Sequence, residues 1–356
     1  MRARCVVECV DLDAESERVA AGGFWAVVGD FDGPVRAWRF ADVERHGATD
    51  PLPAAAGPPL AWRGPAASSW STSLDRAAYE CGVEAVRQEI RDGQVYQANL
   101  CRVLTAPLAG AGGEPDAGAL ARVLAAGNPA PYAGGVHVPA ASGLPPVWVV
   151  TASPELFLRL EGEVLTSAPI RGTGITADAM GGKDRAENVM ITDLVRNDLQ
   201  RVCTPGTVEV TSLLGVERHP GLFHLVSTVR GRLDPDVAQA PDRWAQVLRA
   251  TYPPGSVSGA PKSAALRVIR EQENVPRGPY CGVVGWIDAD AGRAELAVAI
   301  RTFRWTADDG GPACERSGTL SFGTGAGITW GSDPAAEWLE TELKARILVS
   351  LASTGG

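Results

Sequence analysis

The chain has 356 residues, which is long enough for one large domain or two small ones. Its hydrophobic content of 45% and charged content of 21% are ordinary for a globular enzyme. The net charge of -9 argues against nucleic acid or an anionic membrane as the partner, and no apolar run approaches the length of a transmembrane span.

The first segment and the cysteines indicate a cytoplasmic protein. The opening residues, MRARCVVECVDLDAE, meet acids too early to form the apolar core of a signal peptide. The seven cysteines are scattered, odd in number and without a CxxC pair, which is typical of free thiols in a reducing compartment. Only four histidines exist, so a zinc site built from Cys and His is not expected.

The first 72 residues are expected to be rich in strands. Short apolar runs alternate with polar breaks over residues 1–46, and a Pro/Ala/Gly-rich connection follows at 49–69. We expect residues 1–72 to be integrated in the fold of the catalytic domain that follows, residues 73–352.

A helix and a strand open that larger part. The segment SLDRAAYECGVEAVRQEIRDG starts with a cap-like Ser73, carries apolar residues at helical spacing and ends at Gly93, so it predicts a helix. The segment VYQANLCRVL (95–104) alternates as a strand, which puts Gln97 and Asn99 on one face.

The remaining elements predict an α+β fold. VWVVT (147–151) reads as a buried strand, and LFLRLEGEVLTSAPI predicts a hairpin that turns near Glu161 and Gly162. Because strands run in blocks with irregularly placed helices, packed sheets are favoured over a doubly wound sheet. Helices are further predicted at 184–203, 241–250, 260–273 and 334–351, and strands at 223–231, 281–288, 295–305 and 319–329.

The predicted helix 184–203 begins with two acids on the side that we expect to be buried. Its apolar stripe, which includes Ile191 and Leu199, continues backward to Glu187 and Asp184. The acids therefore extend the buried face of the helix into its first turn.

The last predicted helix repeats this arrangement. Leu343, Ile347 and Leu351 predict its buried stripe, which continues backward to Glu340 and Glu337. Acids also favour a first turn through the helix dipole alone. A buried carboxylate is nevertheless costly unless it is paired or bound to metal, and hard oxygen ligands without Cys or His point to Mg²⁺.

A further acid stands at the mouth of the predicted hairpin. A turn at residues 161–162 places Glu155 opposite about residue 168, with Arg171 a few residues away at the same end. A glutamate beside a cation is a candidate general acid, and a surface ion pair is the alternative.

Four other features are weaker signals. A lone histidine among apolar neighbours, such as His224, is more often a core residue than a catalyst. Arg301 ends an apolar strand and needs an anion, either a structural acid or a substrate carboxylate. GTGAG (323–327) lacks the spacing of a dinucleotide loop. Lys262 follows a predicted helix start whose N–H groups would suit an anion.

Lysine is rare in this chain. Of 33 basic residues only Lys183, Lys262 and Lys344 are lysine. A lysine kept where arginine is the rule is a candidate for a role that arginine cannot fill.

Taken in order, these segments resemble the chorismate-utilising enzymes: component I of anthranilate synthase and of aminodeoxychorismate synthase, and more distantly the isochorismate and salicylate synthases. The resemblance covers about residues 75–350 and implies a single large domain of packed, mostly antiparallel sheets with helices outside. The matching segments are DGQVYQANLCR (92–102), SPELF (153–157), APIRGT (168–173), ENVMITDLVRNDL (187–199), FHLVSTVRG (223–231), PPGSVSGAPK (253–262), YCGVVGWID (280–288), AIRTF (299–303), GTGAGIT (323–329) and SDPAAEWLETELKA (332–345).

The resemblance implies a role for each acid. Glu187 and Glu340 would ligate Mg²⁺, which binds the ring carboxylate of chorismate, and Asp184 and Glu337 would support that shell. Glu155 would be the general acid that protonates the departing C4 hydroxyl.

The resemblance also implies a set of substrate contacts. His224 would lie beside the reacting ring. Tyr280, Arg301 and the backbone of Gly325 and Gly327 would hold the substrate carboxylates, and Lys262 and Thr173 would line the pocket.

Two positions bear on the subfamily. The water-adding relatives carry a lysine base where this chain has Gln97, so glutamine resembles the ammonia-using branch. The aminodeoxychorismate enzymes read PIKGT, with that lysine as the proposed nucleophile, and the anthranilate enzymes read PIAGT. Arg171 departs from both, and a guanidinium cannot act as a nucleophile at neutral pH.

The resemblance therefore predicts aminodeoxychorismate synthase component I, which makes 4-amino-4-deoxychorismate for 4-aminobenzoate and folate synthesis. Amination at C2, as in anthranilate synthase component I or 2-amino-2-deoxyisochorismate synthase, is the alternative. No glutaminase domain is recognisable, so we expect free ammonia or a separate glutamine amidotransferase subunit. A non-catalytic chorismate-binding protein and a nucleotide-binding oxidoreductase are further alternatives.

Overall fold

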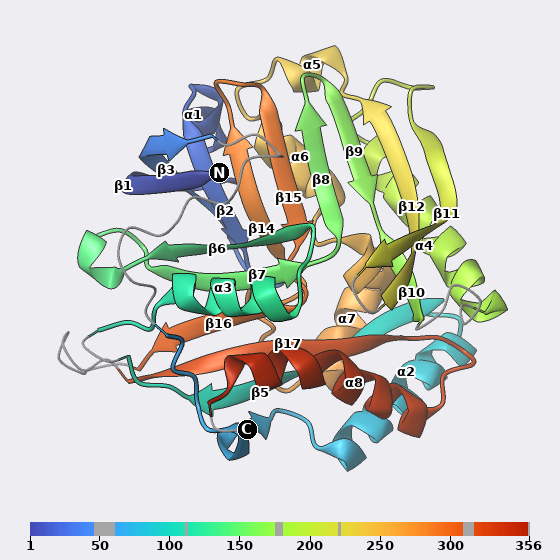
Figure 1. Ribbon diagram of the computed structural model, residues 1–356. Helices are drawn as coiled ribbons and strands as arrows, with labels where there is room; N and C mark the ends of the chain where they lie inside the picture. The colour runs from blue at the N-terminus through green and yellow to red at the C-terminus, as the bar shows by residue number, and fades with distance from the viewer. Residues whose placement is uncertain (46–60, 111–112, 175–180, 220–221, 309–316, 355–356) are drawn as a thin grey trace.

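Two antiparallel sheets form the frame of the computed structural model (Figure 1), which describes residues 1–45, 61–110, 113–174, 181–219, 222–308 and 317–354. Within these residues one sheet has ten strands and the other has seven. The α+β class predicted from the strand blocks is confirmed. Among the described helices, none combines the length and apolarity needed to traverse a lipid bilayer.

The larger sheet joins the N-terminal strands to strands from residues 156–298. Its order is β1-β3-β2-β14-β15-β8-β9-β12-β10, with β11 paired to β12. The bounds are β1 Arg2–Asp11, β2 Phe24–Gly29, β3 Val35–Glu44, β8 Leu156–Glu161, β9 Val164–Ala168, β10 Ile170–Gly174, β11 Glu209–His219, β12 Leu222–Arg232, β14 Val283–Asp288 and β15 Arg293–Val298.

The smaller sheet has the order β13-β5-β17-β16-β7-β6, with β4 paired to β5. The two sheets pack on each other through buried side chains that include Trp38 and Val284 from one sheet and Val138 and Val149 from the other. Its strands are β4 Ser71–Thr72, β5 Gln97–Pro107, β6 Tyr132–Val138, β7 Val147–Ser153, β13 Gly259–Ala260, β16 Thr302–Ala307 and β17 Gly318–Ile328.

Helices cover the outer faces of the sheets. The bounds are α1 Ser16–Ala20, α2 Arg76–Arg91, α3 Ala117–Gly127, α4 Gly182–Gln200, α5 Pro235–Ala238, α6 Arg243–Thr251, α7 Lys262–Gln272 and α8 Pro334–Ala352. In Figure 1, α3 and α8 lie along the smaller sheet, where α3 contacts β7 and α8 contacts β17. α4 packs on β10, β11 and β12 of the larger sheet.

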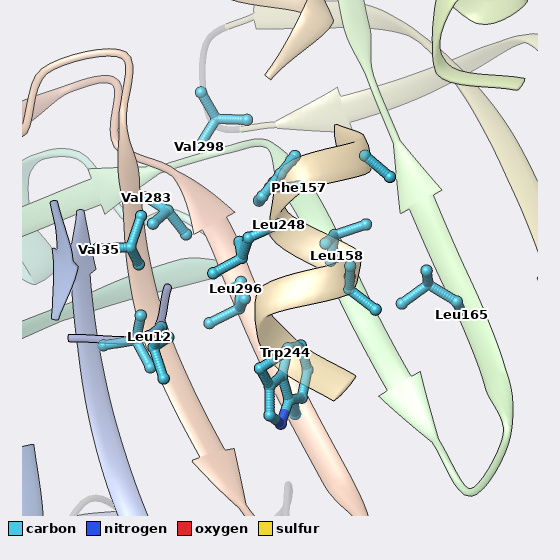
Figure 2. Close-up of a cluster of buried hydrophobic side chains, with 14 of the residues drawn as sticks. Leu12, Val35, Phe157, Leu158, Leu165, Trp244, Leu248, Val283, Leu296 and Val298 are labelled. Atoms are coloured by element: carbon cyan, nitrogen blue, oxygen red, sulfur yellow. The ribbon is translucent and has the colours of Figure 1, made fainter. Parts of the chain in front are cut away.

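The main core lies between the larger sheet and α6. Figure 2 shows Trp244 and Leu248, one helical turn apart on α6, among Leu158, Leu165 and Leu296 from three strands. These side chains are buried. The free energy gained by removing their apolar surface from water is the main contribution that holds α6 against the sheet.

The predicted hairpin is confirmed with a small change of register. β8 and β9 turn at Gly162, and Leu156 rather than residue 155 lies opposite Ala168. Next to the turn Glu161 pairs with Val164, so the turn is centred on residues 162–163 rather than 161–162. The irregularity between Leu156 and Arg159 then brings the pairing one residue closer to the predicted register. The helix predicted from Ser73 is also present but begins at Arg76, with Asp75 as its cap.

The strand predicted at 295–305 is wrong in one respect. It is two strands, β15 in the larger sheet and β16 in the smaller, and Arg301 lies between them with a φ of 53°. Residues other than glycine rarely adopt this left-handed backbone conformation. The chain changes sheets here, which a continuous apolar pattern does not reveal.

The buried face predicted for the last helix is also wrong. Leu343 and Ile347 are 60% and 57% exposed. The buried face carries Glu337, Thr341, Ala345, Leu348 and Ala352. Small side chains on this face let α8 approach the glycine-rich β17. The large apolar residues used for the prediction lie on the exposed face instead.

GTGAG, residues 323–327, lies inside β17 and is paired along its length with β5. A dinucleotide loop links a strand to a helix, so this segment does not have that structure. The hypothesis of a nucleotide-binding oxidoreductase therefore loses the motif on which it was based.

Candidate active site

Glu155 lies at the point where the chain passes from β7 in the smaller sheet to β8 in the larger one. Its side chain is only 3% exposed. Burial raises the pKa of this carboxyl to about 7, against opposing effects from Ser256, the backbone of Ile170, Arg171 and Lys344. The carboxyl is therefore poised to hold or release a proton near neutral pH.

Arg171 of β10 connects the acid of α4 with the glycines of β17. Its Nε donates to Glu187 Oε2 across 2.9 Å. A Cβ added to Gly327 would lie 1.5 Å from Arg171 Nη2, so glycine is needed for this close approach. Arg171 Nη2 is buried and has no hydrogen-bond partner among the described residues.

Lys344 of α8 makes a matching connection from the other side. Its Nζ donates to the carbonyl oxygen of Gly325 at 2.9 Å and to Glu340 Oε1 at 2.6 Å. Lys344 was not predicted as a site residue, although the scarcity of lysine in the chain was a usable signal.

These contacts bring together residues that are far apart in the sequence. Arg171 and Lys344 both act electrostatically on Glu155 and both touch the segment 325–327 of β17. Because each cation also pairs with one predicted metal ligand, Glu187 and Glu340 are both linked to this segment by one intervening side chain.

Glu187 and Glu340 have the ligand chemistry that an open magnesium site would need. Glu187 and Glu340 provide hard oxygen donors, and each forms an ion pair with a basic side chain. Glu337 is 5% exposed, whereas the side chain of Glu340 is 47% exposed. Mg²⁺ commonly takes one or two protein carboxylates and completes its shell with water and substrate oxygens. Within the described part of the chain no three potential ligands cluster, and the side chain of Asp184 lies outside it.

Arg301 has no acidic partner among the residues that the structure describes. Burial lowers its pKa, and no described acidic side chain forms an ion pair with it. Of the two anions considered for this residue, a structural acid is therefore not found among the described residues. The desolvated cation favours binding of an external carboxylate.

Gln97 is buried in β5 and linked to the surroundings of Glu155. Its Nε2 donates to Asn99 Oδ1 at 3.3 Å, and Asn99 Nδ2 donates to the carbonyl oxygen of Ser256 at 3.3 Å. Gln97 Oε1 has no hydrogen-bond partner among the described residues. It is available to accept from a small donor.

His224 and Thr173 are cross-strand neighbours. His224 is buried in β12, opposite Thr173 of β10 on one side and Glu217 of β11 on the other. The side chain of Thr173 lies outside the described part. Tyr280 is buried with its ring against Gly323, and its hydroxyl lies 3.9 Å from Cys101 Sγ.

Lys262 does not offer its amine as an open anion site. Its Nζ donates to Asp198 Oδ2 at 2.7 Å and to the carbonyl oxygen of Thr251 at 2.8 Å. Burial lowers the pKa of Lys262, and Asp198 opposes that effect. Asp198 was not predicted as a site residue, because the sequence around an acid in a helix does not show which distant lysine it contacts.

Comparison with known proteins identifies relatives over most of the chain. The family model described as chorismate binding enzyme matches residues 44–350. Anthranilate synthase component 1 of Streptomyces coelicolor is 38% identical over 319 residues, covering 84% of this chain and 57% of the relative. Aminodeoxychorismate synthase of Streptomyces pristinaespiralis is 38% identical over 277 residues, covering 74% and 35%. The chain thus spans less than two thirds of the length of these curated relatives.

Solved structures have the same fold. Anthranilate synthase component I of Streptococcus pneumoniae TIGR4 superposes with a TM-score of 0.77 at 23% identity, covering 98% of this chain and 91% of that one. The menaquinone-specific isochorismate synthase MenF of Escherichia coli gives a TM-score of 0.67 at 18% identity, covering 94% and 80%.

Proposed function

The chain belongs to the family of chorismate binding enzymes, and from this we propose that it aminates chorismate with ammonia in a Mg²⁺-dependent reaction. One observation carries the proposal. The buried acid Glu155 faces two cations, Arg171 and Lys344, each of which pairs with a carboxylate suited to Mg²⁺.

A dianionic substrate requires local positive charge in the site. Chorismate carries two carboxylates, whereas the protein has a net charge of -9. Arg301 and Lys344 supply local cations, and Arg301 has no described acid to neutralise it. Glu187 and Glu340 would hold Mg²⁺, whose positive charge would attract a substrate carboxylate.

Glu155 is suited to act as a general acid. Burial keeps the carboxyl protonated up to about pH 7, so it is able to donate a proton to the departing hydroxyl at C4. The C–O bond breaks, the oxygen leaves as water, and Glu155 is left as a carboxylate that has to be reprotonated before the next turnover.

Arg171 supports direct attack by ammonia. Its guanidinium stays protonated, and its Nε is committed to Glu187. It therefore orients Glu187 and adds charge near Glu155, while nitrogen reaches the ring without a covalent enzyme intermediate. Gln97 at the buried end of β5 provides an amide that hydrogen-bonds ammonia without removing its proton.

We assign the amination to C4, which makes the chain an aminodeoxychorismate synthase component I. The segments YQANL and DLVRNDL resemble the aminodeoxychorismate enzymes more than the anthranilate enzymes, which supports this product, and Gln97 supports amination over the addition of water. The relative from Streptomyces pristinaespiralis bears the matching name.

Amination at C2 is the second candidate. Arg171 replaces the lysine of the C4 enzymes, and several relatives named anthranilate synthase component 1 are 34–38% identical to this chain. Their names say component 1, which supports a separate amidotransferase subunit as the source of ammonia here.

Product analysis tests the proposal. The protein is incubated with chorismate, Mg²⁺ and ammonium, and aminodeoxychorismate lyase is then added; 4-aminobenzoate is the expected product. Anthranilate or 2-amino-2-deoxyisochorismate would move the assignment to C2. Unconsumed chorismate would instead support a protein that binds chorismate without converting it. A parallel sample with EDTA controls for the metal.

A further inference from the structure

A small cavity lies behind Glu155, within the larger sheet and its covering helices. Its polar lining comes from five elements or turns and consists of Glu155, Ser167, Asp198, Thr251 and Ser256. The cavity has a volume of about 10 Å³ for the centre of a water molecule, which is room for about one water.

The Glu155 end of the cavity needs a hydrogen-bond partner. Glu155 Oε1 is buried and has none among the described residues. Leaving a buried polar atom unpaired costs about 1–3 kcal/mol, so such atoms are usually satisfied by protein or by ordered water. A water in this cavity would satisfy it.

The other end of the cavity leads to a buried ion pair. Asp198 of α4 lines the cavity and is 8% exposed, and Lys262 of α7 is 18% exposed. Their 2.7 Å contact therefore joins a buried carboxylate to a lysine whose side chain is partly exposed.

We propose that Asp198 and Lys262 are positioning residues that resupply the Glu155 proton through one water bound in this cavity. The inference rests on the proposed role of Glu155 as a general acid. It gives Lys262 a function through Asp198, in place of direct contact with substrate.

Each proton transfer in this relay is balanced. After the hydroxyl has left, Lys262 gives a proton to the Asp198 carboxylate, Asp198 passes it to the water, and the water gives one of its protons to the Glu155 carboxylate. Lys262 then regains a proton from solvent, and Asp198 is again a carboxylate. No bond other than O–H and N–H changes, and no other reactant is needed.

The charged groups around both acids support the relay. Arg171 and Lys344 face Glu155, and its other neighbours are Ser256 and the backbone of Ile170. Asp198 faces Lys262 and Arg201. Burial raises the pKa of Asp198 and lowers that of Lys262, which brings donor and acceptor closer in proton affinity.

Two variants perturb the relay in different ways. Asp198→Asn removes the acid but keeps its shape, and Ser167→Val fills the cavity while leaving the ion pair intact. Asp193→Asn is the matched control, because Asp193 lies on the same helix, is exposed and pairs with Arg196. Circular dichroism melting establishes that each variant is folded.

Infrared titration of the Glu155 carboxyl, assigned by its loss in Glu155→Gln, is the first measurement. Asp198→Asn should lower the titration midpoint by about half a unit to one unit, because a negative charge is removed. Ser167→Val should raise it by a similar amount, because a dry cavity solvates the carboxylate less well. Unchanged midpoints in both folded variants would overturn the inference.

The infrared result does not depend on amination, so it separates failure of the relay from failure of the proposed function. Turnover is the second measurement: both variants should lower kcat at least several-fold with KM for chorismate unchanged, and Asp193→Asn should change neither. A crystal structure at high resolution is the third, and an ordered water between Glu155 and Asp198 is expected. An empty cavity would overturn the inference.

Discussion

Arg171 Nε donates a hydrogen bond to Glu187 Oε2 at 2.9 Å, which pairs the position that departs from the family motif with a predicted metal ligand. The arginine at position 171 therefore does more than replace the lysine nucleophile of the C4 enzymes. It places a permanent cation between α4 and β17 and sets the charge around Glu187 and Glu155.

Arg171→Lys should retain or increase the 4-amino product. A lysine at this position restores the motif of the C4 enzymes and, unlike arginine, is able to lose its proton and act as a nucleophile. Chromatographic quantification of 4-aminobenzoate after addition of the lyase measures the effect. A switch toward anthranilate would contradict the prediction and the assignment to C4.

Glu187→Gln and Glu340→Gln should each abolish Mg²⁺-dependent turnover while the protein stays folded. The amide keeps the shape of the side chain but is a far weaker ligand for Mg²⁺. Initial rates across a Mg²⁺ titration, together with thermal melting, measure the effect. Asp193→Asn on α4 serves as the control acid. Full activity in either glutamine variant would remove that residue from the metal site.

The rate should fall with rising pH because of Glu155. Its folded pKa is raised to about 7, and the protonated form is the active one, so kcat should be level below pH 7. Above that value it should decrease about tenfold per pH unit. Glu155→Gln should lower kcat strongly and remove this limb from the residual rate. An unchanged alkaline limb in that variant would show that another group titrates.

The sequence predicted the elements better than it predicted their faces. Period and caps located α4, α8 and the β8–β9 hairpin, because these signals depend on neighbours in the chain. The exposed Leu343 and Ile347 were assigned to the core, since the fit of small residues such as Ala345 against a glycine strand depends on a distant element. The switch of sheets at Arg301 was missed for the same reason.

The candidate site divides in a similar way. Motif resemblance selected Glu155, Arg171 and Glu187, and the structure brings these three together. Lys344 and Asp198 were not selected, because their importance lies in which partners they meet across the fold. Contacts of this kind involve residues far apart in sequence and cannot be inferred from spacing along one chain.

Arg301→Gln should weaken chorismate binding without weakening the fold. Arg301 forms no ion pair with a described acid, so the substitution breaks no such pair. It also removes the free-energy cost of keeping a charged group away from water. A lost charge-assisted hydrogen bond is worth about 1.5–3 kcal/mol, which corresponds to a roughly 10- to 100-fold rise in KM. Steady-state kinetics and chemical denaturation measure the two effects. A large loss of stability would indicate a structural anion instead.

Arg102→Met should loosen α8 and weaken the metal site that this helix carries. The buried guanidinium of Arg102 donates to Thr341 Oγ1 at 3.0 Å, pairs with Glu342 and stacks 4.1 Å from the ring centre of Trp338. Methionine keeps the apolar packing but loses the hydrogen bonds and the cation–π contact, which together are worth about 2–3 kcal/mol.

Urea denaturation should show that loss in the free energy of unfolding of the Arg102 variant, and the Mg²⁺ concentration for half-maximal turnover should rise because α8 positions Glu340. Arg76→Met is the matched control, since Arg76 belongs to an exposed pair with Glu80 on α2 and exposed pairs contribute little. If the Arg102 variant lost stability with no change in Mg²⁺ dependence, α8 would not position a metal ligand, and the site would have to be built on α4 alone.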